Sequence, residues 1–201
     1  MNIEAFISGA IGDSIGVKRE MLADRSFLAK IERVARAAVH TFRRGGKVML
    51  AGNGGSAADS QHLAGELVNR FRFDRPPLAA IALSTDTSVM TSIANDSSFD
   101  NIFARQVAAL GKKGDMFIGI STSGRSVNVI NALKECRKKK ITTVGFTGCR
   151  PSAMERLCDY CLAFPSGDTP RVQEAHILAG HIICDVIEMS LFRPPRRSGR
   201  K

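Results

Sequence analysis

The sequence predicts an α/β domain in which a parallel sheet of five strands is covered by helices on both faces. Five short apolar segments alternate with stretches that have the 3.6-residue spacing of helices. Strands that alternate with helices form parallel sheets, because each helix returns the chain to the start of the next strand. The chain has 201 residues, 44% of them hydrophobic, which is sufficient for one domain with its own core.

The expected elements follow one another without a linker that divides the chain. Two helices over 2–22 and 25–44 precede the sheet, and Gly45-Gly46 ends the second one. The expected strands are the apolar segments 47–52, 78–83, 116–121, 141–148 and 158–164. The remaining helices are expected over 56–70, 87–95, 99–110, 126–139, 152–157 and 170–192.

The composition excludes several classes of protein. The N-terminus lacks the basic start of a signal peptide, and an odd number of cysteines, five, argues against a disulfide framework. Half of the net charge of +10 lies in residues 193–201, which are rich in Pro and Arg and are expected to form a disordered tail. We therefore expect one domain over residues 1–192, in the cytoplasm, with no membrane segment and no nucleic-acid partner. For the tail and the basic run 137–140, an anionic partner is the alternative to a solvated surface.

Two turns after expected strands have the composition of a phosphate site. The first, residues 52–56, is GNGGS, and glycines allow the backbone to approach a ligand closely. The second, residues 121–126, is STSGRS and lies at the start of a helix, where exposed amides attract anions. An ordinary helix cap is the alternative, but a cap uses one hydroxyl and this turn offers four. We therefore predict phosphate binding at this edge of the sheet.

Acid–base and metal candidates lie on two of the expected helices. His62 and Glu66 are one helical turn apart and share a face, and Asp59 lies near that face. The last helix carries His181 together with Gln173 or Glu174, and spacing alone does not choose between these two. Such groups bind zinc or transfer protons, although a surface pair is the alternative for His62 and Glu66.

The remaining cysteine and histidine motifs are predicted to be structural. Cys158 and Cys161 have no second pair to complete a zinc site. Three residues apart on one strand, their thiols are expected to point to opposite faces. His176 is expected to point away from the candidate site.

Four segments resemble the signature segments of the phosphoheptose isomerase family, which belongs to the sugar-isomerase (SIS) domain superfamily. They are AGNGGSAADSQHLAGELVNRF (51–71), SIANDSSFDNIFARQV (92–107), ISTSGRSVNVI (120–130) and RVQEAHILAGHIICDVIE (171–188). The segment ISTSGRS by itself indicates only an SIS domain. Its combination with AGNGGSAADSQH and QEAHILAGH, in family order, is more specific.

The resemblance implies a three-layer αβα domain and a homotetramer with the N-terminal helices in its subunit contacts. It implies a zinc ion on His62, Glu66, Gln173 and His181 in members that bind metal. It also implies a sugar-phosphate substrate that contacts Asn53, Gly54, Gly55, Glu66, Asn95, Asp96, Ser121, Thr122, Ser123, Ser126 and Gln173.

The implied reaction is the isomerisation of sedoheptulose 7-phosphate to D-glycero-D-manno-heptose 7-phosphate. A proton leaves C1 and another arrives at C2 through an enediol, which requires a base and an acid. We assign Glu66 as the base and His181 as the acid. A glutamate bound to zinc is a weaker base, so the two roles of Glu66 compete and the sequence leaves both open. The alternative function is a non-catalytic SIS-domain protein that binds a sugar phosphate or regulates a partner.

Overall fold

A computed structural model describes residues 1–192, and the predicted tail of residues 193–201 lies outside the described residues. It confirms the α/β fold with a five-stranded parallel sheet, in the order β2-β1-β3-β4-β5. The strands are β1 (Val48–Gly52), β2 (Ala80–Ala82), β3 (Met116–Ile120), β4 (Thr142–Thr147) and β5 (Tyr160–Ala163). Each expected strand is present, although β2 is shorter than the expected 78–83.

The helices also follow the expected order. Where one helix was expected over 99–110, a 3-10 turn precedes the α-helix, because Ser98 caps a turn at Asp100 before the helix begins. The helical elements are α1 (Ile3–Ala23), α2 (Arg25–Arg43), α3 (Gly55–Val68), α4 (Thr87–Asp96), η1 (Phe99–Asn101), α5 (Ile102–Leu110), α6 (Val127–Lys138), α7 (Ala153–Leu157) and α8 (Thr169–Phe192).

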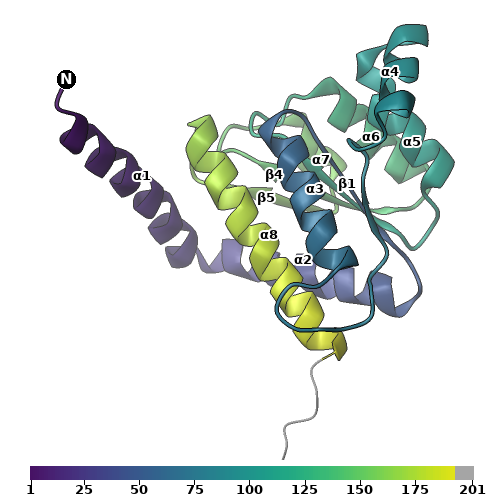
Figure 1. Ribbon diagram of the computed structural model, residues 1–201, viewed down its shortest axis with the longest axis horizontal. Coiled ribbons are helices and arrows are strands. Elements are labelled where there is room, and N and C mark those ends of the chain that lie inside the picture. The colour runs from purple at the N-terminus through teal and green to yellow at the C-terminus, as the bar shows by residue number, and fades with distance from the viewer. Residues whose placement is uncertain (193–201) are drawn as a thin grey trace, which may run out of the picture.

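Two hydrophobic clusters lie on the two faces of the sheet and make the domain a three-layer sandwich. On β1, Val48 and Leu50 face the cluster that includes α2, α3 and α8, whereas Met49 and Ala51 face the cluster that includes α5, α6 and α7. Alternation along a strand explains this division, because successive side chains point to opposite faces. Figure 1 shows α3 and α8 side by side over one face, with α5 and α6 at the other side of the domain.

Helix α1 differs from the others because it extends away from the body of the domain (Figure 1). Val17 and Met21 are its only buried residues in the described chain. Its apolar side chains are otherwise exposed, namely those of Ile3, Phe6, Ile7, Ile11, Ile15 and Leu22. An exposed apolar stripe of this size is typical of a surface that binds another protein.

The expected orientation of the Cys158 and Cys161 thiols is wrong. Strand β5 begins only at Tyr160, so Cys158 lies in the turn before it and does not alternate with Cys161. Both thiols lie over Gly145, where an added Cβ would be 2.8 Å from Cys158 Sγ and 3.5 Å from Cys161 Sγ. The pair nevertheless remains half-buried and adjoins the core, as expected for structural cysteines.

Helix α8 is the single helix of the described residues that is long and apolar enough to cross a membrane by length and composition. It packs against α2 and α3, and it contributes Val172, Ala175, Ala179, Ile183 and Ile187 to the core. The central helix of a domain passes the same test, so this helix is explained by its place in the fold.

Candidate active site

The two predicted turns meet at the carboxyl edge of the sheet. Strands β1 and β3 are neighbours, and Gly52 pairs with Ile120 at their ends, so the segments that follow them begin side by side. Gly54 and Gly124, one in each turn, have φ of 54° and 64°, a backbone conformation that favours glycine. A pair of amides connects the turns, since Asn53 and Asn128 exchange two hydrogen bonds of 2.9 Å.

The hydroxyl turn has its side chains partly bonded to one another. Ser121 Oγ lies 2.8 Å from Ser126 Oγ, and Ser123 Oγ accepts a hydrogen bond of 3.2 Å from the Arg125 amide. Helix α6 begins directly after Ser126, and no side chain caps it within the described residues. The Val129 amide donates to Asn128 Oδ1, which leaves the amides of Val127 and Asn128 for an anion, with the positive end of the helix dipole behind them.

A small cavity of about 130 Å³ adjoins the same turn. Thr122 and Ser123 line it on one side, and the guanidinium groups of Arg125 and Arg150 carry its positive charge. Thr169, the first residue of α8, lies on its other side. Hydroxyl donors and two cations give this part of the edge the chemistry that binds a phosphate dianion.

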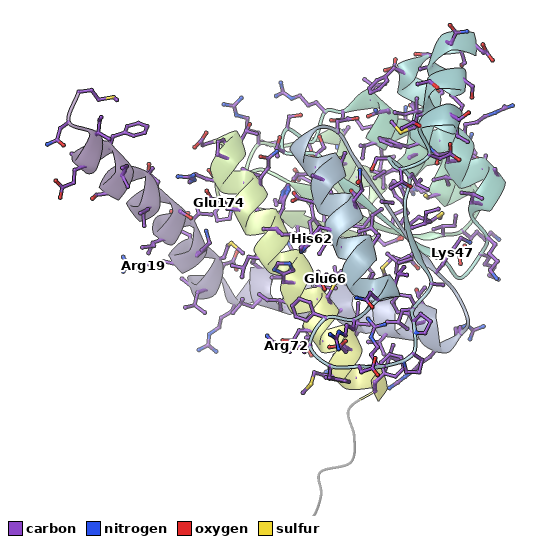
Figure 2. The ribbon with its side chains drawn as sticks, viewed as in Figure 1. Arg19, Lys47, His62, Glu66, Arg72 and Glu174 are labelled. Atoms are coloured by element: carbon purple, nitrogen blue, oxygen red, sulfur yellow. The ribbon has the colours of Figure 1, made fainter. Side chains whose placement is uncertain are left out.

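The acid–base candidates converge where α3 lies beside α8 (Figure 2). His62 Nε2 lies 2.8 Å from His181 Nε2 and 3.3 Å from Glu66 Oε1. The ring of Phe71 stacks beside that of His181, with the centroids 5.5 Å apart. His62 and His181, which are 119 positions apart in the sequence, thus belong to one cluster. Glu66 lies one helical turn after His62 on α3.

The donor atoms of this cluster fit a metal ion. One ligand atom each from His62, Glu66 and His181 lies within 4.8 Å of the others. Two imidazoles and a carboxylate are a common ligand set for catalytic zinc.

The structure distinguishes Gln173 from Glu174, which spacing alone does not. Glu174 faces helix α1 and accepts a hydrogen bond of 2.5 Å from Ser14 Oγ of that helix. It also pairs with Arg171 of its own helix. Gln173 faces the glycine turn instead, so closely that a Cβ at Gly55 would overlap its amide. Of these two residues, only Gln173 faces the first turn.

Comparisons with known proteins show the family of the chain. The family model "SIS domain" matches residues 19–148. The chain is 53% identical to "Phosphoheptose isomerase 2" of Campylobacter jejuni, over 95% of each chain. It is 54% identical to "Phosphoheptose isomerase" of Aneurinibacillus thermoaerophilus, over 94% of this chain and 95% of that one.

The chain belongs to the phosphoheptose isomerase family. A solved structure agrees as well, that of a phosphoheptose isomerase from Francisella tularensis. It superposes with a TM-score of 0.88 at 36% identity and covers 94% of this chain and 100% of that one.

Asp59 is a further carboxylate on helix α3, near His62. Burial raises its pKa, and the nearby His62 partly opposes that effect. Its Oδ2 is buried and has no hydrogen-bond partner among the described residues. Sequence spacing placed Asp59 near the face of His62 and Glu66, and the structure keeps it there.

A buried ion pair supports the cluster and was missed by the sequence analysis. Glu188 of α8 and Arg75 are almost fully buried and lie 3.1 Å apart. Glu188 also accepts hydrogen bonds from the amides of Phe71 and Arg72, and Arg75 donates to the carbonyl of Glu66 at 2.8 Å. The signal in the sequence was an isolated glutamate in the apolar segment of α8, since buried acids are normally paired.

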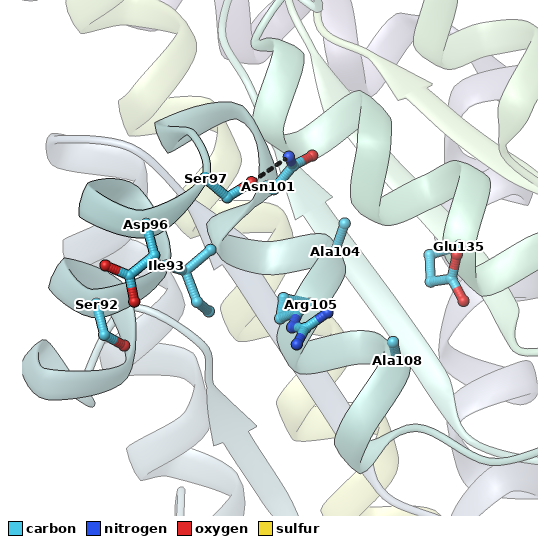
Figure 3. A pocket seen from close by; sticks show the side chains of 9 residues that line it. All are labelled: Ser92, Ile93, Asp96, Ser97, Asn101, Ala104, Arg105, Ala108 and Glu135. Carbon is cyan, nitrogen blue, oxygen red and sulfur yellow. Dashed lines mark hydrogen bonds between the residues drawn. The ribbon is translucent and has the colours of Figure 1, made fainter.

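Asn95 and Asp96 lie apart from this cluster. They are exposed at the end of α4, and Asn95 Nδ2 donates a hydrogen bond of 2.8 Å to Asp96 Oδ1. Figure 3 shows Asp96 in a different pocket, whose other side is formed by Arg105 of α5. The substrate contacts expected at these two residues stay a prediction.

Proposed function

We propose that Glu66 and His181 carry out the isomerisation of sedoheptulose 7-phosphate to D-glycero-D-manno-heptose 7-phosphate. The chain is a phosphoheptose isomerase, a sugar-phosphate aldose–ketose isomerase. The observation that supports the assignment is the convergence of His62, Glu66 and His181. They lie on α3, which begins in the glycine turn, and on α8, whose first residue lines the cavity beside the hydroxyl turn. A base, an acid and a phosphate site are the three parts that this reaction needs.

The proton transfers balance with these two residues. The Glu66 carboxylate removes a proton from C1 while a ring N–H of His181 donates one to the C2 oxygen, which gives the enediol. Glu66 then returns its proton to C2, and His181 takes the proton from the C1 hydroxyl. The product is the aldose, and both side chains are back in their starting states.

The rest of the site holds the substrate in place. Ser121, Thr122, Ser123 and Ser126 bind the phosphate, together with the first amides of α6. Asn53, Gly54, Gly55 and Gln173 contact the sugar near the reacting carbons, and Asn95 and Asp96 complete the proposed set. Because the phosphate lies far from C1 and C2, its binding orients the substrate without taking part in the chemistry.

We assign a zinc ion to His62, Glu66 and His181, with Gln173 as the fourth ligand. Gln173 offers an amide oxygen, and its place beside the glycine turn supports this assignment. A bound zinc ion supplies a Lewis acid that polarises the C2 carbonyl. A glutamate that held zinc would be a weaker base, so the roles of Glu66 as ligand and as base compete.

The proposed assembly is a cytoplasmic homotetramer of one domain per chain, residues 1–192. The exposed apolar side chains of α1 support subunit contacts at this helix. A non-catalytic sugar-phosphate-binding protein is the alternative function. The sugar isomerase domain of an RpiR transcription factor from Sphaerobacter thermophilus shares the fold at 16% identity, which is a likeness of fold alone.

The test is incubation of the purified protein with sedoheptulose 7-phosphate and a panel of other ketose phosphates in deuterated water. We expect an aldose product and deuterium at C2 with sedoheptulose 7-phosphate, and slow turnover of the unphosphorylated ketose. Binding of the heptulose phosphate without product would favour the non-catalytic alternative. Faster turnover of another ketose phosphate would show that this other sugar phosphate is the preferred substrate, and the proposed reaction class would stay the same.

A further inference from the structure

A cleft rich in positive charge lies at the edge of the sheet opposite the candidate active site. Gly46, Gly114 and Thr142, which precede or begin β1, β3 and β4, line its floor, so it lies at the amino ends of the strands. Its volume is about 830 Å³, within the range of small-molecule sites. Lys47, labelled in Figure 2, marks this edge of the molecule.

Three separate segments bring their basic residues to this cleft. The cations are Arg33, Arg36 and Arg44 from α2 and its C-terminal end, Lys112 and Lys113 from the segment between α5 and β3, and Lys140 from the turn between α6 and β4. His40 lines the cleft as well, and no acidic side chain does so among the described residues. Six cations from three segments are not explained by the solvated face of one helix.

Three acids lie near these cations. Asp159 lines an adjoining pocket together with Lys140, and its carboxylate accepts hydrogen bonds from the amide and the hydroxyl of Thr143. Asp115 is buried and bonded to Lys47, which does not line the cleft. Glu32 pairs with Arg36 at 2.7 Å, but both side chains are more than half exposed, and such a pair contributes less than about 1 kcal/mol. Arg36 is therefore free to exchange Glu32 for a more highly charged ligand.

Helix dipoles offset only part of the charge. The C-terminal ends of α2, α5 and α6 lie at this edge, and each carries about −0.5 of an elementary charge. Three such ends compensate roughly one and a half of the six cations. A clear positive excess is left in a concave site, where field lines are focused.

We propose that this cleft binds an oligophosphate anion, a ligand with three or more negative charges on linked phosphates. A single phosphate carries at most two charges at neutral pH and would leave most of the cations unpaired. Arg side chains suit phosphate oxygens because they donate two parallel hydrogen bonds. The hydroxyls of Tyr160 and Thr142 also line the cleft and add neutral donors. The concave shape favours a small anion over a duplex nucleic acid, whose backbone needs an extended surface.

The test is calorimetric titration of the full chain with inorganic tripolyphosphate at low and at physiological salt. The cleft variant Lys112→Gln/Lys113→Gln/Lys140→Gln should bind at least tenfold more weakly than the wild type. The matched control Arg25→Gln/Lys134→Gln/Arg156→Gln removes the same number of positive charges at exposed positions outside the cleft, and should stay within about twofold. Added salt should weaken binding, because the contacts are ionic.

A second variant separates the cleft from the active site. Ser121→Ala/Ser123→Ala should keep full affinity for tripolyphosphate, and sedoheptulose 7-phosphate should not compete with it. The proposal is overturned if tripolyphosphate does not bind, if the control variant loses as much affinity as the cleft variant, or if the Ser121 and Ser123 changes abolish binding. It is also overturned if a short duplex DNA binds at the cleft and tripolyphosphate does not.

Discussion

At the scale of single residues, the site is built from side chains whose partners are far away in the sequence. His62 and Glu66 share a face of α3 because they are four residues apart. They lie 3.3 Å apart, and the third member of the cluster, His181, comes from α8. The same contact distinguishes this pair from an ordinary surface pair, which was the alternative that the spacing left open.

Glu66→Gln tests the base directly. The change keeps the size of the side chain and removes the basic carboxylate, so we expect kcat to fall by about 100-fold or more with little loss of substrate binding. The decisive measurement is exchange of the C1 proton of bound ketose with solvent deuterium. Exchange at the wild-type rate would leave Glu66 only a ligand. In that case His62→Ala should be as damaging as Glu66→Gln, and excess zinc should partly rescue both.

The buried side chain of His176 is expected to make the free energy of unfolding depend on pH. It is buried against Phe164 and Phe146, and burial lowers its pKa to about 4, only partly opposed by a bond to the carbonyl of Thr147. Below pH 6.5 the unfolded chain takes up a proton at this residue that the folded chain does not. The free energy of unfolding should therefore fall between pH 6.5 and 4, by roughly 2 to 3 kcal/mol at pH 4.5.

The measurement is urea denaturation of the wild type and of His176→Gln at pH 7.5, 5.5 and 4.5. The amide of glutamine can still donate to Thr147, but it does not titrate. The two proteins should therefore converge in stability as the pH falls. Carboxylates with lowered pKa act in both proteins and cancel in the comparison. A parallel loss of stability in both would show that His176 does not contribute to it.

At the scale of elements, the turns and the buried pair position the reacting groups. Glu188 and Arg75 join α8, the end of α3 and the segment that follows it. Burial opposes ionisation of Glu188, but hydrogen bonds from Phe71, Arg72 and Arg75 outweigh it and hold its pKa below the usual range. The pair thus satisfies the last carbonyls of α3 and holds Phe71 beside His181.

Glu188→Ala should lower both the stability of the fold and the catalytic rate. It leaves a buried Arg75 without its partner, which costs about 3 to 5 kcal/mol in comparable cases. Glu188→Gln should be milder in stability and should lower kcat more than it raises KM, because the phosphate turn is untouched. The control is Asp185→Asn on the same helix, which weakens a more exposed pair between Asp185 and Arg72. Equal effects of Glu188→Gln and Asp185→Asn on kcat would contradict a positioning role.

The hydroxyl turn should determine substrate affinity. Removing the hydroxyls in Ser121→Ala/Ser123→Ala deletes two donors to a charged group, so KM should rise at least tenfold while kcat changes less. Ser26→Ala/Ser190→Ala removes two exposed hydroxyls elsewhere and serves as the control. An unchanged KM in steady-state assays would exclude this turn as the phosphate site.

At the scale of the whole molecule, the exposed apolar side chains of helix α1 predict that the chains assemble into an oligomer. Its apolar stripe is exposed in the single chain, which is costly unless another subunit covers it. Light scattering at micromolar concentration should give a tetramer. Ile7→Glu/Ile11→Glu should yield smaller species with an unchanged helix content, whereas Ala5→Glu/Gly9→Glu, on another face of α1, should remain tetrameric. A wild type that is monomeric would contradict the proposed assembly.

The sequence by itself determined the order of the elements and the residue types of the site. Periodicity is local, so it located each strand and helix to within a few residues. Turn chemistry predicted a phosphate site at residues 52–56 and 121–126. It could not choose between Gln173 and Glu174, because both positions are compatible with one helix and only the neighbours α1 and α3 differ.

Only the tertiary structure decided which distant side chains meet. The partnership of Glu188 with Arg75, the placing of both cysteines over Gly145 and the gathering of three basic segments at the amino edge all depend on how elements pack. Spacing along the chain carries no information about such contacts, because they join elements whose relative positions are set by burial of the core on both faces of the sheet.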